Sequence, residues 1–246
     1  MCHNHSTAPD PDSTIARHSR HTNAEVPYLS FDDGRDIEQP WLILATDIYG
    51  INDFYRHLAE LLAQQGYRVA IPDLFHRVGP PRDDSREAAL QRRRLLDDRQ
   101  TLADFEAVID EVTAGQPYGA IGFCLGGTLA LLSAASRPEQ TTLTWYAFPR
   151  GAPGAKVAVA APIEVAHRIE GPVLAFWGRE DYIDHHEVDE LGAVLDKGGS
   201  PHEIVWYDHV GHAFLSGLTE PGPSSQAAQD SWRRGLSFLA THLVGG

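Results

Sequence analysis

The stretch that most constrains this chain is Tyr118-Gly-Ala-Ile-Gly-Phe-Cys-Leu-Gly-Gly-Thr128, an apolar run that ends in a corner of small residues. Residues 118–123 are expected to form a buried strand, and residues 128–135 a helix that begins within a few residues of it. Cys124 then lies at the corner between these two elements. The rest of the chain is arranged around this strand-to-helix turn.

Glycines lie two positions before and two positions after Cys124, at Gly122 and Gly126. Side chains there would collide with the crossing backbone, and glycine removes that collision. This spacing lifts the thiol above the carboxyl edge of a sheet and over the positive end of a helix dipole, which favours the attacking thiolate. Cys124 is therefore a candidate nucleophile. The simpler alternative is a buried cysteine in a glycine-rich packing corner.

Length and composition favour one α/β domain, because the chain has 246 residues and 42% of them are apolar. The net charge is −14, and no basic stripe interrupts it, so nucleic acid and anionic membrane surfaces are not expected as partners. No apolar run approaches the roughly 20 residues of a membrane span. The two cysteines, Cys2 and Cys124, imply no disulfide framework and favour a cytoplasmic protein.

The first 24 residues are expected to be a disordered polar leader, with a single domain over residues 25–246. The leader is rich in Asp, Ser, Pro and His, and it lacks the apolar core of a signal peptide. Several of its side chains are of the types that bind soft metals. Their spacing is loose, so a solvated tail is preferred and no metal or other cofactor is expected. These side chains are Cys2, His3, His5, His18 and His21.

Apolar patterning along the chain predicts alternating strands and helices, which implies right-handed crossovers and a mostly parallel sheet flanked by helices. Asn52 is expected to cap the first helix, which runs to Gly66. The expected strands are residues 26–31 at an edge, 41–45, 67–71, 118–123, 141–147, 173–177 and 203–207. The other expected helices are residues 85–113, bent or in two pieces, 128–135, 187–195 and 225–243.

Two segments allow more than one interpretation. The run Arg92-Arg93-Arg94, followed by Asp97-Asp98, is expected to be a solvated face with local ion pairs. Residues 148–171 are rich in Pro, Gly and Ala. They form either a cover for the site or an ordinary surface connection.

A thiol nucleophile needs a base and an acid, and in an open parallel sheet these gather where strands end at the carboxyl edge. Asp181 follows the strand that ends near Trp177, and His212 follows the strand that ends near Tyr207. The order nucleophile, acid, histidine matches that of hydrolases. We therefore select Cys124, Asp181 and His212. The rivals are His185, His186, His202 and His209 for the base, and Glu180 and Asp184 for the acid.

The oxyanion of an acyl-transfer intermediate requires backbone N–H donors. One usually follows the nucleophile, and another lies in the loop after an earlier strand. The sequence places these donors at Leu125 and Ile48.

Several motifs follow one another along residues 41–246: Asp47-Ile-Tyr-Gly-Ile-Asn52, Gln65-Gly-Tyr67, Pro72-Asp-Leu-Phe75, Gly122-Phe-Cys-Leu-Gly-Gly127, Asp181 and Gly211-His-Ala-Phe214. Taken together, these motifs resemble those of the dienelactone hydrolase family of α/β-hydrolases. The resemblance implies an α/β-hydrolase fold and a cysteine hydrolase of small esters or lactones.

The resemblance also suggests roles for two further residues. An acidic residue after the first buried strand would hold the resting thiol until a substrate carboxylate displaces it; this position is Asp47, where well-known members carry glutamate. Arg86 aligns with an arginine that grips the substrate carboxylate; its alternative is an ordinary surface cation. A second such arginine should follow the Gly-His-x-Phe motif, but Leu215-Ser216 stands there. Its loss argues against dienelactone itself as substrate.

The leading hypothesis is a hydrolase that cleaves small esters or lactones, carboxylate-bearing ones included, through a Cys-His-Asp triad and an acyl-thioenzyme. The expected partner is this small molecule, and the protein is expected to be a monomer or small homo-oligomer. One alternative is an acyltransferase or thioesterase that uses the same triad. Another is a non-catalytic ligand-binding or redox-sensing protein on the same fold.

Overall fold

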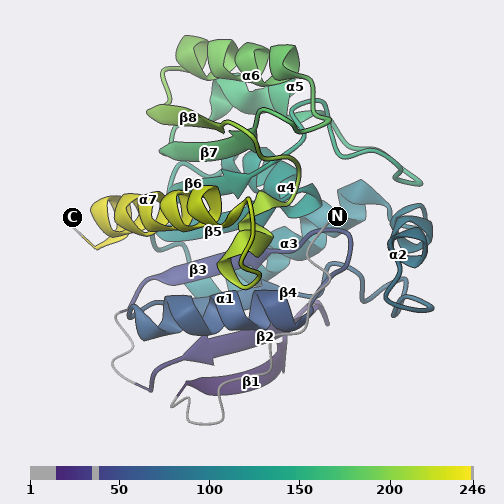
Figure 1. The fold of residues 1–246 in the computed structure, drawn as a ribbon. Coiled ribbons are helices and arrows are strands. Elements are labelled where there is room, and N and C mark those ends of the chain that lie inside the picture. The colour runs from purple at the N-terminus through teal and green to yellow at the C-terminus, as the bar shows by residue number, and fades with distance from the viewer. Residues whose placement is uncertain (1–14, 35–38, 245–246) are drawn as a thin grey trace.

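The computed structural model describes residues 15–34 and 39–244, which form a single eight-stranded sheet with helices on both faces (Figure 1). The strand order is β1-β2-β4-β3-β5-β6-β7-β8. The first two pairings in this order are antiparallel and the other five are parallel. The strands are Ala16–His21 (β1), Pro27–Asp32 (β2), Trp41–Ala45 (β3), Arg68–Pro72 (β4), Tyr118–Phe123 (β5), Gln140–Trp145 (β6), Val173–Gly178 (β7) and His202–Tyr207 (β8).

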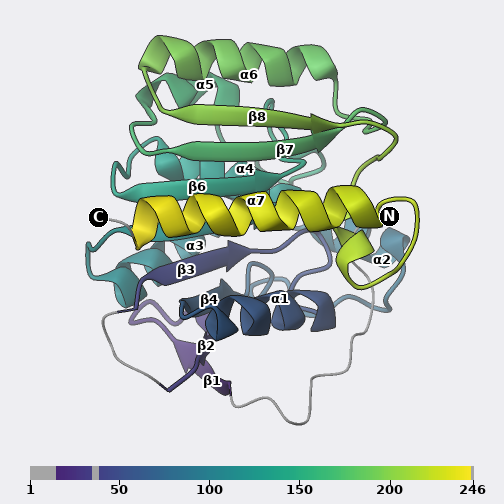
Figure 2. The same ribbon diagram turned by 60° about the vertical axis from the view of Figure 1, so that its left-hand side comes forward.

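Helices cover the sheet in two layers. Helices α1 and α7 pack on one face, and α3 and α4 pack on the other (Figure 2). The α-helices are Asp53–Gln64 (α1), Arg86–Arg93 (α2), Asp98–Thr113 (α3), Leu125–Ala134 (α4), Pro162–Val165 (α5), His185–Gly198 (α6) and Ser225–Leu243 (α7). Short 3-10 helices span Ala166–Arg168 (η1) and Phe214–Leu218 (η2). This is the α/β-hydrolase arrangement that the sequence predicts.

Local sequence accounts for most of these elements. Asn52 caps α1 as predicted, because its side chain accepts a hydrogen bond of 3.2 Å from the Tyr55 N–H. Strands β5 and β7 are buried along their whole length, which explains their near-continuous apolar character. Within the described residues, no helix combines the length and apolar character needed to cross a bilayer.

The predicted leader extends too far, because Ala16–His21 form strand β1. This strand pairs antiparallel with β2, from Ala16 opposite Asp32 to His21 opposite Pro27. Its side chains are mostly exposed, so backbone hydrogen bonds to β2 hold it in place without an apolar pattern. Residues 26–31 are therefore not an edge strand. Of the leader's metal-binding side-chain types, His18 and His21 lie on β1, while Cys2, His3 and His5 lie outside the described residues.

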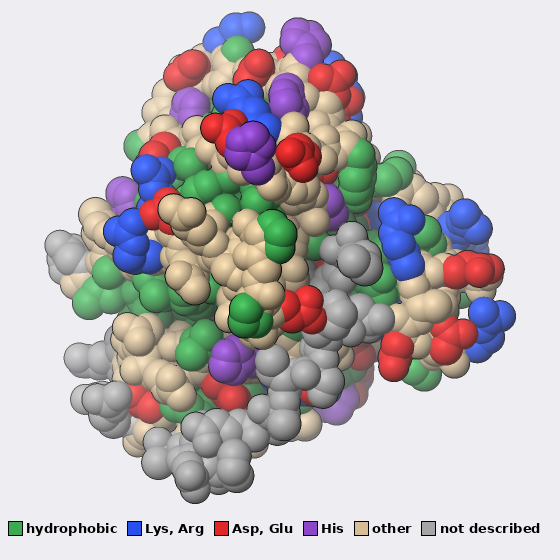
Figure 3. Space-filling model, viewed as in Figure 1, with side chains coloured by type: hydrophobic (Ala, Val, Ile, Leu, Met, Phe, Trp, Pro, Cys, Tyr) green, Lys and Arg blue, Asp and Glu red, His purple; other side chains and the backbone are tan. Residues whose placement is uncertain are grey.

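The arginine run forms a local ion pair, Arg93 with Asp98, as the sequence predicts, but Arg92 and Arg93 are buried and do not form the predicted solvated face. The helical segment divides into α2 and α3, and side chains of both signs lie over α2 on the surface (Figure 3). Beneath them, Arg93 is only 1% exposed and forms a buried ion pair with Asp98, with N–O distances of 2.6 and 2.8 Å. Arg92 is 8% exposed and its guanidinium lies 4.0 Å from the centre of the Phe75 ring. Both charges can be buried because each guanidinium has a partner inside the protein, Asp98 for Arg93 and the Phe75 ring for Arg92.

Candidate active site

Cys124 lies on a sharp corner between β5 and α4. Its backbone has φ 55° and ψ −115°, a strained conformation for a residue with a side chain. A Cβ at Gly122 would lie 2.4 Å from the Gly126 carbonyl oxygen, and one at Gly126 would lie 2.1 Å from that of Ala45. Glycine is therefore required at both positions for strand and helix to meet this closely. The predicted elbow is present, and α4 begins immediately after the cysteine.

Hydrogen bonds fix the corner to the neighbouring strand. The Cys124 N–H donates to the Trp145 carbonyl at 3.1 Å, at the end of β6. The Thr128 hydroxyl donates to the Cys124 carbonyl at 3.3 Å and accepts from the Phe148 N–H at 3.1 Å. One threonine thus joins the nucleophile's corner to the connection that follows β6.

The loops after β7 and β8 lie directly against each other. The Arg179 N–H donates to the Tyr207 carbonyl at 2.8 Å, and the Glu180 N–H donates to the Val210 carbonyl at 3.0 Å. Gly178 permits this contact, because a Cβ there would lie 2.1 Å from the Val210 carbonyl oxygen. Side chains from two separate strand ends are therefore held at hydrogen-bonding range.

The residues brought together are Asp181 and His212. The His212 Nδ1 lies 2.9 and 3.1 Å from the two carboxylate oxygens of Asp181, and these side chains are 4% and 1% exposed. Because a carboxylate accepts hydrogen bonds, we assign the proton to Nδ1. Asp181 also accepts from the Ile183 N–H at 3.1 Å, which orients the carboxylate. This arrangement leaves Nε2 of the neutral imidazole as the basic nitrogen.

The rival residues have other surroundings. Asp184 caps α6 through the His186 N–H, and Glu180 is 64% exposed beside His209. The His185 ring contacts the Arg179 carbonyl and packs on Trp206, and the His202 Nδ1 lies 3.0 Å from the Ser200 carbonyl. Among these candidates, the structure pairs His212 with Asp181.

A cavity of about 160 Å³ opens beside the thiol. Two of its walls, Phe148 and Tyr182, also pack against the His212 ring, with centroid distances of 5.7 and 4.6 Å. The imidazole and the cavity therefore share aromatic neighbours. The described residues that line it are Ile48, Arg86, Leu90, Arg93, Cys124, Phe148, Ala152, Pro153 and Tyr182.

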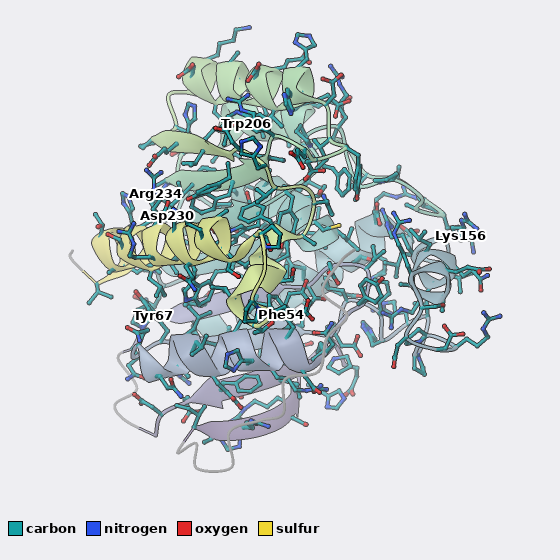
Figure 4. The ribbon with its side chains drawn as sticks, viewed as in Figure 1. Phe54, Tyr67, Lys156, Trp206, Asp230 and Arg234 are labelled. Carbon is teal, nitrogen blue, oxygen red and sulfur yellow. The ribbon has the colours of Figure 1, made fainter. Side chains whose placement is uncertain are left out.

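Part of the irregular stretch after β6 thus lies at the site, through Phe148, Ala152 and Pro153. The Arg93 guanidinium donates to the Ala152 carbonyl at 2.8 Å. Farther along, the Lys156 N–H donates to the Leu96 carbonyl at 2.9 Å, beside the end of α2 (Figure 4). These bonds anchor the stretch to the α2–α3 junction.

The two residues predicted as oxyanion donors lie next to Cys124, Leu125 in the chain and Ile48 in the same cavity wall. Ile48 lines the cavity, and its N–H has no hydrogen-bond acceptor among the described residues. Leu125 is the first residue of α4, so its N–H has no acceptor within the helix.

Arg86 and Asp47 lie in different settings. Arg86 is the first residue of α2 and lines the cavity with Cys124, with an exposed side chain. Asp47 is fully buried, and its carboxylate accepts a 2.8 Å hydrogen bond from the Tyr49 N–H. It also interacts electrostatically with Arg92.

Two residues near the site escaped the sequence reasoning. Tyr146 directly follows β6, has φ 42°, and its buried ring lies 4.9 Å from that of His212. Its position at a strand end was the available signal. Arg92 contacts the connection between β3 and α1, residues 46–52, which we call the Ile48 loop. No pattern in the sequence distinguishes Arg92 from its exposed neighbour Arg94.

Comparison with known proteins identifies the family of this chain. The model of the dienelactone hydrolase family matches residues 28–243. The chain belongs to the dienelactone hydrolase family. A carboxymethylenebutenolidase of Rhodococcus opacus is 52% identical over 100% of this chain and 99% of its own length. Another, from Pseudomonas putida, is 30% identical over 82% of this chain and 85% of its own.

A crystal structure from Klebsiella pneumoniae, of a protein assigned as a dienelactone hydrolase, has a TM-score of 0.80 with this member of the family. It covers 92% of this chain and 98% of its own at 24% identity, so this likeness concerns the fold. Sequence relationship and fold together make the protein a hydrolase of the lactone-cleaving type. Within the described residues, no group of three or more His, Cys, Asp or Glu side chains is arranged to hold a metal ion.

Proposed function

We propose that this dienelactone hydrolase family member cleaves small, carboxylate-bearing lactones or esters by forming an acyl-thioenzyme on Cys124. His212 acts as the base and Asp181 holds it in the Nδ1–H form. The Ile48 and Leu125 N–H groups receive the developing oxyanion, and Arg86 pairs with the substrate carboxylate. Asp47 holds the resting Cys124 thiol until the substrate carboxylate displaces it.

In the first half of the reaction, the Cys124 proton passes to His212 Nε2 and the thiolate sulfur bonds to the acyl carbon. The carbonyl electrons move to oxygen, where the backbone N–H groups stabilise the charge. Collapse of this intermediate breaks the C–O bond, and the leaving oxygen takes the proton from His212. In a lactone, this oxygen stays attached to the acyl chain.

In the second half, His212 removes a proton from water and the hydroxyl oxygen attacks the thioester carbon. The C–S bond then breaks, the carboxylic acid leaves, and the proton on His212 returns to the sulfur. One water is consumed for each C–O bond cleaved. Asp181 stabilises the imidazolium in both halves without taking its proton.

The substrate class is argued from the cavity and from the relatives. About 160 Å³ lies below the 300–1,000 Å³ typical of drug-sized ligands, which favours a small substrate. Arg86 supplies a cation on the cavity wall, and the names of the R. opacus and P. putida relatives favour a carboxymethylene-substituted butenolide. The absence of a second arginine after the Gly-His-x-Phe motif argues against dienelactone as the substrate, whereas the names of these relatives favour it. The carboxylated lactone is therefore the first substrate to test.

The observation that carries the proposal is the buried Asp181–His212 pair, whose imidazole shares Phe148 and Tyr182 with the cavity that holds Cys124. A base oriented by an acid, next to a cysteine on a strand-to-helix corner, is the arrangement that thiol-dependent acyl transfer requires.

The test compares variants on a carboxylated butenolide and on a neutral short-chain aryl ester. Cys124→Ala is expected to abolish hydrolysis of both, whereas Cys2→Ala keeps it. Arg86→Ala is expected to raise KM about tenfold or more for the carboxylated substrate only, a magnitude typical of a charged hydrogen bond. Full activity of Cys124→Ala would refute the mechanism, and an equal effect of Arg86→Ala on both substrates would refute carboxylate recognition.

The same assay separates the competing functions. Product analysis with added alcohol detects transesterification, the mark of an acyltransferase. A ligand-binding or redox-sensing protein would show no turnover to lose in Cys124→Ala, although its thiol would still react with alkylating agents.

A further inference from the structure

The Ile48 loop is held by bonds on nearly every peptide group around the proposed oxyanion donor. The Asp47 N–H donates to the Tyr55 hydroxyl at 3.3 Å, and the Gly50 N–H donates to the Asp47 carbonyl at 3.1 Å. The Tyr49 N–H donates to the Asp47 carboxylate at 2.8 Å. The Ile48 N–H itself has no acceptor among the residues that the structure describes.

The Ile48 carbonyl is also held by a hydrogen bond, and its donor is Arg92. The Arg92 Nη2 donates to this oxygen at 3.1 Å, from a side chain that is 8% exposed. Because the carbonyl belongs to the peptide next to the one that carries the Ile48 N–H, the bond limits rotation about the Ile48 Cα. The direction of the N–H therefore depends on Arg92.

Arg92 is itself firmly placed. Its guanidinium lies 4.0 Å from the centre of the Phe75 ring, and a Cβ at Gly50 would lie 3.1 Å from Nη2. Burial lowers the pKa of Arg92, and the carboxylates of Asp73 and Asp47 act in the opposite direction. The guanidinium stays charged, because an arginine remains protonated in proteins.

Arg92 acts from behind the loop and not from the substrate side. It lines a separate cavity of about 620 Å³, together with Tyr49 and Asp73, whereas Ile48 lines the cavity beside Cys124. The residues described for the cavity beside the thiol do not include Arg92. Any effect of Arg92 on catalysis must therefore pass through the loop.

We propose that Arg92 is a positioning residue that orients the Ile48 N–H toward the oxyanion formed on the Cys124 adduct. This inference rests on the proposed function, because it requires that Cys124 form a tetrahedral adduct. Removing an oxyanion donor outright costs about 10²–10³ in kcat, so misaligning one is expected to cost about tenfold or more.

The test uses the full-length protein, with Arg92→Met to remove the donor and Arg92→Lys to keep a charge and a weaker donor. Arg94→Met, an exposed change at the end of the same helix, is the matched control. Two readouts separate the oxyanion from the thiol. Butanal inhibits by forming a thiohemiacetal whose oxygen occupies the oxyanion position, whereas iodoacetamide alkylates the thiol without creating that oxygen.

Arg92→Met is expected to lower kcat for the aryl ester about tenfold and to weaken inhibition by butanal by a similar factor. KM and the alkylation rate should stay within about twofold of wild type, Arg92→Lys should fall between, and Arg94→Met should match wild type. In the resting protein, the amide NMR signal of Ile48 should shift more than that of Leu125. If Arg92→Met does not fold, Phe75→Leu carries the test with a smaller loss in the same two readouts.

Unchanged kcat and butanal inhibition in Arg92→Met would overturn the inference, and so would an alkylation rate that falls as far as turnover. Failure of the proposed function would look different: Cys124→Ala would retain hydrolysis whatever residue stands at position 92.

Discussion

The buried ion pair between Arg93 and Asp98 predicts a large loss of stability from one isosteric change, Asp98→Asn. Two N–O contacts of 2.6 and 2.8 Å join side chains that are 1% and 8% exposed. The asparagine can accept one of these bonds, but the guanidinium keeps its charge on a side chain that is only 1% exposed. Breaking a buried pair in this way costs about 3–5 kcal/mol of unfolding free energy. Because one hydrogen bond is retained, we expect a cost at the lower end of this range, about 3 kcal/mol.

The loss converts directly into a melting temperature. Unfolding entropy of about 2.1 cal/mol/K per residue gives about 0.5 kcal/mol/K for 246 residues, so about 3 kcal/mol lowers Tm by about 6 °C. Differential scanning calorimetry of the full-length protein at pH 7 measures this shift.

Asp110→Asn is the matched control, because this carboxylate also bonds an arginine at 2.7 Å but is 67% exposed. The control should cost less than about 1 kcal/mol, or about 2 °C. The double variant Arg93→Met with Asp98→Leu should recover most of the loss, because it removes both buried charges. The reasoning is refuted if Asp98→Asn melts no lower than Asp110→Asn, or if the double variant melts no higher than Asp98→Asn.

Two further changes test other parts of the structure. Gly126→Ala would place a Cβ 2.1 Å from the Ala45 carbonyl oxygen, so it should reduce hydrolysis at least about 100-fold or prevent folding. The control Gly192→Ala meets only the flexible Ile204 side chain and should leave activity unchanged. Equal activity of the two variants would contradict the packing argument. Burial, with a smaller contribution from Asp110, raises the pKa of Glu106, against the effect of Arg137. The free energy of unfolding therefore falls as pH rises through this raised pKa. Glu106→Gln should melt at a higher temperature than wild type at pH 7, and the two melting temperatures should converge below about pH 4. A constant difference in melting temperature across that range would count against this explanation.

The sequence predicted the parts of the fold that rest on local patterns. Continuous apolar runs located β3, β5 and β7, and the glycines around Cys124 located the elbow, because each reflects a constraint within a few residues. The rule that functional groups follow parallel strands selected Asp181 and His212, and the structure pairs them. The catalytic roles of these residues remain predictions.

What the sequence could not predict depends on contacts between elements that the side-chain pattern of one element does not record. Strand β1 is polar and gains its place from the backbone of β2, so no side-chain pattern marks it. Arg92 and Arg93 look like surface charges until the Phe75 ring and the Ile48 and Ala152 carbonyls are brought to them. Whether a charged side chain is buried depends on the assembled fold, so it cannot be predicted from the residues of its helix alone.

The direct backbone contact between the loops after β7 and β8 has a consequence for redesign. Because Gly178 lies against Val210, and the Arg179 and Glu180 amides bond the neighbouring loop, acid and base are mounted on one rigid support. Cys124 is mounted on another, the turn between β5 and α4. Loop grafts from other members of the family should therefore transplant residues 179–184 and 208–213 as a single block.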